Sequence, residues 1–310
     1  KKNTPGYRLK YYCYMLNVAN EAQLEPIGYQ LQKALDLLPK NLNRQSKTRD
    51  TKWDKYYYYP NGKAPGEQSL KQIQDKYPNS TYILALPLWQ LLEEEKAPAS
   101  FYIDFLLRMP GNIKNLIFSK SNPYELKDTL SIRTTRSIMR IGGYHALACL
   151  LALSKLEDFE LISLPCAMKE HQIIQLLMLC CQNLPLQMVA GELFEVIIRY
   201  QFEYYEIPSK ERLLSMQSTF AIHTKNLAYA ESILRPLNLC MSKPQRVELL
   251  YWLVQSNVSE TLADIKKVYK HQQLAKGGKG LLWVIEKLRY RARGIMKTRL
   301  EFLYEELQKP

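Results

Sequence analysis

Five basic side chains near the end of the chain have the residue types and the close spacing that suit phosphate binding: Lys287, Arg289, Arg291, Arg293 and Lys297. An arginine guanidinium can donate two parallel hydrogen bonds to one phosphate, so an arginine-rich surface favours that ligand. Residues 266–299 hold eleven Lys/Arg and one acid, Glu286, which leaves few carboxylates to form ion pairs along a helix. We interpret this surface as a site for a polyanion. A plain solvated face and a site for an acidic protein are the alternatives.

A second basic group lies near the start of the chain: Arg44, Lys47, Arg49, Lys52, Lys55 and Lys63. Trp53 and four consecutive tyrosines, residues 56–59, lie among these cations. Basic side chains contact backbone phosphates and aromatic rings can stack on bases, so the combination indicates nucleic-acid binding. For Trp53 itself, a place in the core of a small domain is the favoured interpretation.

Positive charge is therefore concentrated at the two ends of the chain. Residues 1–82 carry fourteen Lys/Arg against seven Asp/Glu, and residues 266–299 carry an excess of ten. The whole chain has a net charge of +13, so the remainder is net negative by four. Charge that is concentrated in this way predicts a polyanionic partner, whereas evenly spread lysine would indicate only solubility.

Signatures of catalysis and of metal binding are not found in the sequence. Gly62-Lys63 and Gly278-Lys279 lack the earlier glycine and the following hydroxyl residue of a phosphate-binding loop. His145 and Cys149 lie one helical turn apart, but no second pair accompanies them. The six cysteines show no CxxC spacing, which indicates buried free thiols in a reducing compartment. We expect a protein without enzymatic activity, cofactor or metal ion.

Helical periodicity runs through most of the chain and predicts an all-α fold. The first helix is expected over residues 21–38, where Pro39 ends it. Further helices are expected over residues 67–77, 81–95, 99–109, 123–130, 134–156, 167–183, 187–205, 209–219, 223–235, 243–256, 259–275 and 280–308. In the last of these, the apolar residues fall within about one third of the circumference and the five basic residues spread over the opposite face.

The length of the chain is typical of two domains or of one large helical domain. We expect a small basic and aromatic domain over residues 1–96, and a larger helical domain over residues 97–310 that ends in a long basic helix. The longest apolar stretch, residues 141–153, is shorter than the roughly twenty residues of a membrane span, so it predicts a buried helix. No signal peptide is visible. A cytoplasmic location is expected, associated with the nucleoid or, in a eukaryote, in the nucleus.

Residues 40–80 resemble the end of a Cro/C1-type helix-turn-helix. The likeness rests on Trp53-Asp54, Gly62, Pro65, Leu70 and Ile73, which follow the order in which that family ends one helix and begins the next. It covers about an eighth of the chain, and nine positions separate Trp53 from Gly62, where the family has fewer. The resemblance implies that residues 48–55 form the recognition helix and offer Arg49, Lys52 and Lys55 to DNA.

These patterns predict a non-catalytic nucleic-acid-binding protein that acts as a regulator or as a subunit of a nucleoprotein complex. Duplex DNA is the favoured partner, and RNA, which the aromatic run would suit, is the less favoured one. The main alternative is a helical adaptor that docks protein partners. The leucine-rich residues 173–181 and 193–200 are its candidate surfaces, although a place in the buried core is the favoured interpretation for them. A membrane partner is not expected, because no lipid-anchor signal accompanies the basic helix.

Overall fold

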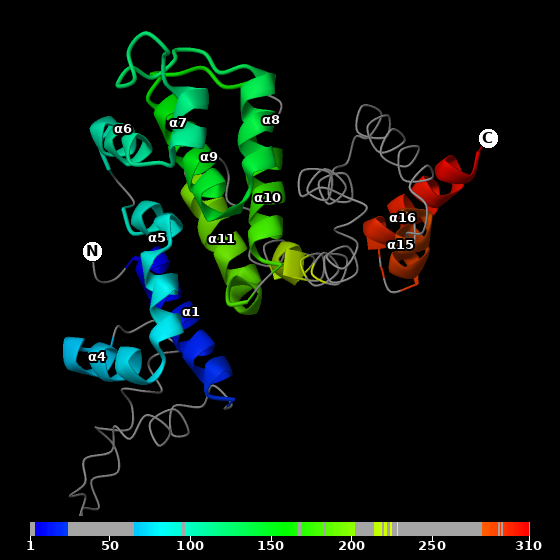
Figure 1. Cartoon of the computed structure of the whole chain (residues 1–310), viewed down its shortest axis with the longest axis horizontal. Helices are drawn as coiled ribbons and strands as arrows, with labels where there is room; N and C mark the ends of the chain where they lie inside the picture. The colour runs from blue at the N-terminus through cyan, green and yellow to red at the C-terminus, as the bar shows by residue number, and fades with distance from the viewer. Residues whose placement is uncertain are drawn as a thin grey trace, which may run out of the picture. The chain divides into compact units, whose positions relative to one another are not determined.

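The computed structural model describes residues 4–23, 65–94, 97–165, 169–182, 184–201, 214–218, 220–221, 224, 228, 281–290, 292 and 294–309. Within these ranges the elements are α-helices and two 3₁₀ helices, and no strand is present (Figure 1). Extended pairing is confined to two isolated bridges, Phe118 with Leu126 and Thr129 with Ser163. The expected all-α class is confirmed.

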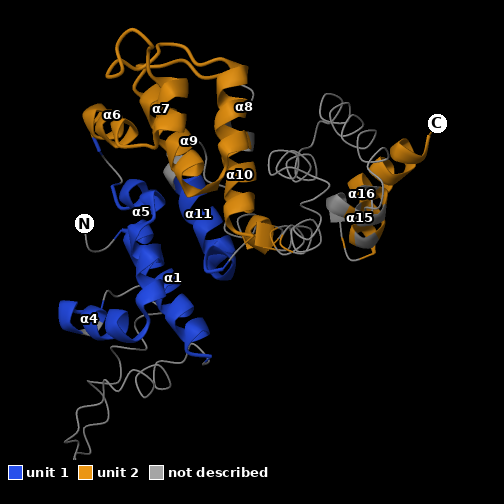
Figure 2. Cartoon of the chain, viewed as in Figure 1, with its two compact units in different colours: residues 1–97, 184–207 blue, residues 98–183, 208–310 orange. Residues whose placement is uncertain are grey.

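The chain divides into two compact units, coloured separately in Figure 2. Unit 1 comprises residues 1–97 and 184–207, and unit 2 comprises residues 98–183 and 208–310. The sequence places residues 184–207 in the C-terminal domain, whereas the structure joins them to the N-terminal one. The reason is packing, because α11 (Ala190–Gln201) lies against α1 (Pro5–Glu21) and α5 (Pro87–Leu92), both in unit 1.

Helix α1 is the centre of unit 1, although its sequence shows no helical stripe. Thr4 caps its start, since the Thr4 side chain accepts a hydrogen bond of 3.3 Å from the amide of Tyr7, and Pro5 occupies the first turn. Residues 13–19 are all buried. Because this part of the helix is covered on every side, apolar residues occur all around it, with Asn17 as the one polar exception in residues 13–19, so the 3.6-residue periodicity on which a sequence prediction depends is absent.

The 3₁₀ helix η1 (Pro78–Ala85), α5 and α11 pack around α1, and α4 (Glu67–Lys76) packs against η1. Helix α4 agrees with the expectation, but the helix expected over residues 81–95 is replaced by η1 and by α5. Pro87 explains the interruption, because the residue before a proline is disfavoured in the α conformation, and Leu86 has a ψ of 131°. The indole nitrogen of Trp89 donates a buried hydrogen bond of 2.6 Å to the carbonyl of Ile83 and ties the two pieces together.

Unit 2 is built around one buried helix, α9. Its other well-packed helices are α6 (Ala99–Leu107), α7 (Gly111–Ile117), α8 (Ile132–Ile141) and α10 (Lys169–Cys180). Helix α9 (Gly143–Asp158) packs against α6, α8 and α10, and its residues 146–156 are all buried. The expectation of a buried helix within residues 141–153 is confirmed.

Two expected helices of unit 2 differ from the structure. The prediction of a helix over residues 123–130 is wrong. The chain forms a turn there, in which the Asn122 side chain accepts a hydrogen bond of 3.1 Å from the amide of Tyr124. The helix over residues 134–156 is two helices, because Gly142 and Gly143 have φ angles of 67° and 75° and break the chain between α8 and α9. Helix α7, which was not expected, begins directly after Pro110.

The prediction of one long basic helix at the C-terminal end, residues 280–308, is also wrong. Residues 281–308 form two helices, α15 (Leu281–Arg289) and α16 (Gly294–Gln308), which pack against each other. Their buried side chains include Ile285 and Leu288 on α15, and Leu300, Leu303 and Leu307 on α16. The two apolar faces cover one another, which a single straight helix cannot do. The helices expected over residues 21–38, 223–235, 243–256 and 259–275, and most of 209–219, lie outside the described residues.

Gly6 permits the close approach of α1 to the end of α5. A methyl group at Gly6 would overlap the backbone carbonyl of Leu92. We therefore expect Gly6→Ala to destabilise unit 1 by about 1–3 kcal/mol, the usual range for overpacking a core. Urea unfolding followed by circular dichroism measures the change. Gly66→Ala is the control, because no atom lies within 4 Å of the added carbon, and we expect it to cost less than about 1 kcal/mol. Equal midpoints for the two variants would contradict the close approach.

Buried thiols give a second test of the fold. Cys13, Cys149 and Cys180 are free and buried, and burial raises the pKa of Cys13 and of Cys180 to about 12. We expect these three to resist alkylation by iodoacetamide at pH 8 until the chain is unfolded, because the thiolate is the reactive form. Peptide mass spectrometry reads out each site. Stability should also fall as the pH rises above the ordinary thiol pKa of 9.0, since only the unfolded thiols then ionise. Rapid alkylation of Cys13 in native buffer would contradict the packing.

Candidate nucleic-acid interface

The predicted contact residues are only partly described. Most of the stretch that resembles a helix-turn-helix lies outside the described residues. So does the whole N-terminal set of predicted contacts: Arg44, Lys47, Arg49, Lys52, Lys55 and Lys63. In the C-terminal set, Arg291, Arg293 and the side chain of Lys287 are likewise outside them. Arg289 and Lys297 are described. The roles of the undescribed residues stay predictions.

Arg289 lies at the end of α15 with its guanidinium held by two aromatic rings. The guanidinium carbon is 4.1 Å from the ring centroid of Tyr304 and 5.4 Å from that of Tyr290. A hydrogen bond with Tyr290 raises the pKa of Arg289. A guanidinium that stacks through its face keeps N–H groups along its edge, which is the geometry for binding an anion.

Lys297 is not part of a basic surface without acids, contrary to what the sequence predicts. Its ammonium is 3.9 Å from a carboxylate oxygen of Glu301, four residues on, and both side chains are about half exposed. An exposed pair of this kind contributes less than about 1 kcal/mol. Helix α16 also carries Glu305 and Glu306, so acids outnumber the basic residues Lys297 and Arg299 along it. The expectation that ion-pair partners are missing from the terminal helix does not hold for α16.

A third basic surface, which the sequence reasoning missed, lies on α8. We call it the α8 arginine stripe: Arg133, Arg136 and Arg140, all exposed. Positions i, i+3 and i+7 fall within about 60° of one another around a helix. The opposite side of α8 is buried through Thr135, Ile138 and Met139, and α8 packs there against α7 and α9. One face of α8 is therefore buried and the other carries the arginines, with Ile132 as an exposed apolar residue in the first turn.

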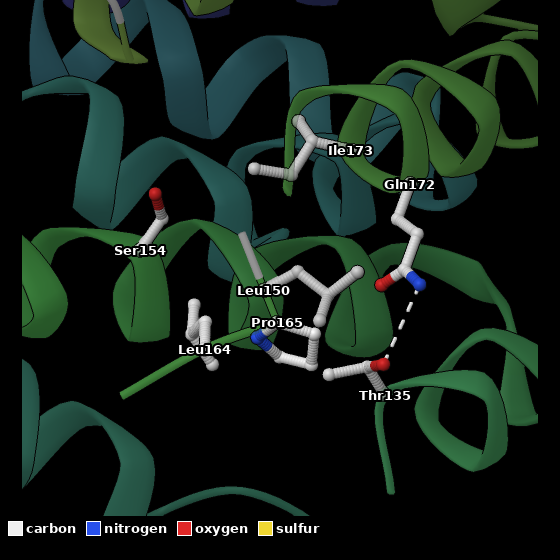
Figure 3. Close-up of a pocket in the computed structure, with 7 residues that line it drawn as sticks. All are labelled: Thr135, Leu150, Ser154, Leu164, Pro165, Gln172 and Ile173. Carbon is white, nitrogen blue, oxygen red and sulfur yellow. Dashed lines mark hydrogen bonds between the residues drawn. The ribbon is translucent and has the colours of Figure 1, made fainter. Parts of the chain in front are cut away.

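The N-terminal cap of α8 and one polar contact on its buried side fix its orientation. Ser131 caps the start by accepting a hydrogen bond of 3.2 Å from the amide of Thr134. On the buried side, the hydroxyl of Thr135 accepts a hydrogen bond of 3.4 Å from the side chain of Gln172 on α10 (Figure 3). The same hydroxyl donates to the carbonyl of Ile132 at 3.0 Å. These bonds satisfy the polar group that α8 buries.

A small cavity adjoins that contact. Thr135, Ser154 and Gln172 supply its polar lining, and the other residues in Figure 3 are apolar. Its volume is about 10 Å³, which is at most the room of a single water molecule. This cavity is too small for a substrate, so the surface of α8 and not its buried side is available for binding.

Along α8 itself, the arginines of the α8 arginine stripe have only other arginines as charged neighbours. No acid stands three or four positions from any of its arginines, and each arginine has another as a neighbour at that distance. Like charges at this spacing destabilise a helix by a few tenths of a kcal/mol each. Arg133 also lies in the first turn, where a cation opposes the helix dipole. Arg136 and Arg140 interact with other groups of the protein as well. The charge repulsion is retained although it opposes the helix.

A local count of charge could have found this surface. Residues 108–140 hold seven Lys/Arg and two acids, Glu125 and Asp128. The acids that precede and follow this window make the middle of the chain net negative, so averaging over the whole middle conceals the excess.

Other kinds of site find little support in the described part of the chain. No group of three His, Cys, Asp or Glu residues there could hold a metal ion. His145 is exposed whereas Cys149 is fully buried, so the two cannot face a common ligand. Among the helices that the structure describes, none combines the length and the apolar content that crossing a membrane requires.

The leucine-rich helices considered for protein docking are part of the core. Ile173, Leu176 and Leu177 on α10 are buried, and so are Leu193 and Ile197 on α11. Their apolar faces are therefore occupied by the chain itself.

Comparisons with protein-family models, with curated proteins and with solved structures found no match.

The junction between α8 and α9 gives a test of how the stripe is positioned. Gly142 has φ 67° and ψ −175°, a conformation that is essentially restricted to glycine. We expect Gly142→Ala to destabilise unit 2 by about 1–3 kcal/mol. Gly111→Ala is the control in the same unit, because the added carbon meets no atom within 4 Å, and it should be neutral or slightly stabilising. The shift of the urea midpoint measures both variants, and an unchanged midpoint for Gly142→Ala would show that the turn is not required.

Proposed function

We propose that this protein binds nucleic acid without catalysing a reaction on it, with duplex DNA as the preferred partner, as a regulator or as a subunit of a nucleoprotein complex. The observation that carries the proposal is the concentration of charge, an excess of seven over residues 1–82 and of ten over residues 266–299. A phosphate backbone is the polyanion that such segments attract through counterion release.

Arg289 supports the proposal in structural terms. Its contact with Tyr304 at 4.1 Å holds the guanidinium in place before any ligand arrives, so less rotamer freedom is lost on binding. Arg291 and Arg293 follow within four residues in the sequence, which concentrates positive charge in the segment after α15.

A protein-docking role is the second candidate, and one observation favours it. Phe159 and Leu161, at the end of α9, are 46% and 47% exposed, which is unusual for large apolar side chains so close together. A subunit of a complex can use both surfaces, so the two roles are compatible.

A fluorescence-anisotropy titration tests nucleic-acid binding directly. The probes are a duplex DNA, a single-stranded DNA and an RNA of equal length, each titrated at several salt concentrations. If the end segments neutralise about six phosphates, log K should fall with log[salt] at a slope near −5 for the duplex. A slope near zero for all three probes would overturn the proposal, and steeper, tighter binding of RNA would replace DNA as the partner.

Charge reversal separates the two candidates. We expect the triple variant Arg289→Glu, Arg291→Glu and Arg293→Glu to lose retention on a DNA column. The variant Phe159→Ser with Leu161→Ser is the comparison, because it removes the exposed apolar surface and leaves the charge unchanged. DNA retention that is lost in the serine variant and kept in the charge-reversed one would contradict the assignment of the site.

A further inference from the structure

We propose that the α8 arginine stripe is a separate contact for the phosphate backbone of nucleic acid, in addition to the two ends of the chain. The choice of nucleic acid as the occupant rests on the proposed function. The surface itself is an independent observation, because Arg133, Arg136 and Arg140 lie in the middle of the chain and in unit 2.

The spacing of the three arginines fits a linear array of phosphates. From Arg133 to Arg140 the helix rises about 10.5 Å. One strand of a duplex carries a phosphate for about every 3.4 Å of its axis, so about three phosphates pass along that length. The three arginines lie on one side of the helix, and a duplex whose axis runs parallel to α8 presents about three phosphates of one strand along that length.

The burial of the other face makes the stripe a rigid element. Ile138 and Met139 are buried, and Thr135 is bonded to Gln172, so α8 cannot rotate to hide its arginines. An array that is fixed in advance loses little freedom when it binds. Because phosphate contacts carry no base information, the stripe would position the nucleic acid and not read its sequence.

A line of three cations favours a polymer over a single anion. One phosphate or sulfate can engage one or two of the guanidiniums, whereas the full length of the stripe requires several anionic groups at regular spacing. An acidic protein segment also presents several carboxylates, but its charges lack the fixed separation of a backbone. The arginine content agrees with phosphate as well, since guanidinium groups bind it with paired hydrogen bonds.

The test is the full-length triple variant Arg133→Gln, Arg136→Gln and Arg140→Gln in the duplex titration. We expect its affinity for duplex DNA to fall at least about tenfold, and its salt slope to become shallower by about 2 to 3. The loss should be the same for duplexes of unrelated sequence. Because Arg136 and Arg140 also interact with other groups of the protein, the melting temperature of the variant is measured as well, to show that it is folded at the temperature of the titration.

The matched control is Lys71→Gln, Arg199→Gln and Lys309→Gln. It removes the same net charge, but from three different helices or helix ends, and Arg199 and Lys309 are each paired with a glutamate of their own. We expect the control to change the salt slope by less than about 1. A control that weakens binding as much as the stripe variant would overturn the inference, because net charge alone would then explain the effect.

Failure of this inference can be told apart from failure of the proposed function. If the wild-type protein binds duplex DNA with a steep salt slope and the stripe variant matches it, the stripe is not a contact while the proposed function stands. If the wild-type slope is near zero, both are overturned. If the stripe variant loses binding of polyglutamate and keeps binding of DNA, the occupant is an acidic protein and the inference is overturned in that respect.

Discussion

The packing of α8 on α9 is the contact that fixes which side chains unit 2 offers to solvent. Ile138 and Met139 are buried there, and burying an apolar side chain of this size contributes roughly 1.5–3 kcal/mol. Turning the helix over would expose these residues and bury arginines, and an isolated charge in an apolar core costs far more than that. The outward direction of the α8 arginine stripe thus follows from the core. The glycines at residues 142 and 143 make the arrangement sterically feasible, since they let the chain leave α8 and enter α9 at once.

The same dependence on packing decides how much of the fold could be predicted from the sequence. Helices with one covered side, such as α4 and α6, are predicted closely because their apolar spacing repeats. Helix α1 is not predicted, because a helix that is covered on all sides has no such repeat. The division of the C-terminal segment into α15 and α16 is missed for another reason. A continuous apolar stripe is compatible both with one long helix against a partner and with two short helices against each other, and only the tertiary contact between them decides.

The candidate site shows a similar limit. Residue type and sequence spacing predict a binding role for Arg289, but they do not reveal its contact with the ring of Tyr304, which lies fifteen positions away. Charge summed over long segments identified the ends of the chain and concealed the α8 arginine stripe, because acids elsewhere in the middle cancel it in the count. Acids that cancel the arginines in a count of charge do not neutralise them on the surface, because a charge more than about 8–10 Å away is largely screened at physiological salt. Local windows are the appropriate measure of a surface that binds a polyanion.

Arginine modification by phenylglyoxal, with and without saturating duplex DNA, tests the central claim most directly, because it reports each guanidinium separately in the unaltered protein. Peptide mass spectrometry then gives the protection of every arginine. The structure predicts strong protection of Arg133, Arg136, Arg140 and Arg289 in the complex, with Arg199 modified equally in both states. Equal modification of all of these residues with and without DNA, under conditions where DNA is bound, would contradict the account.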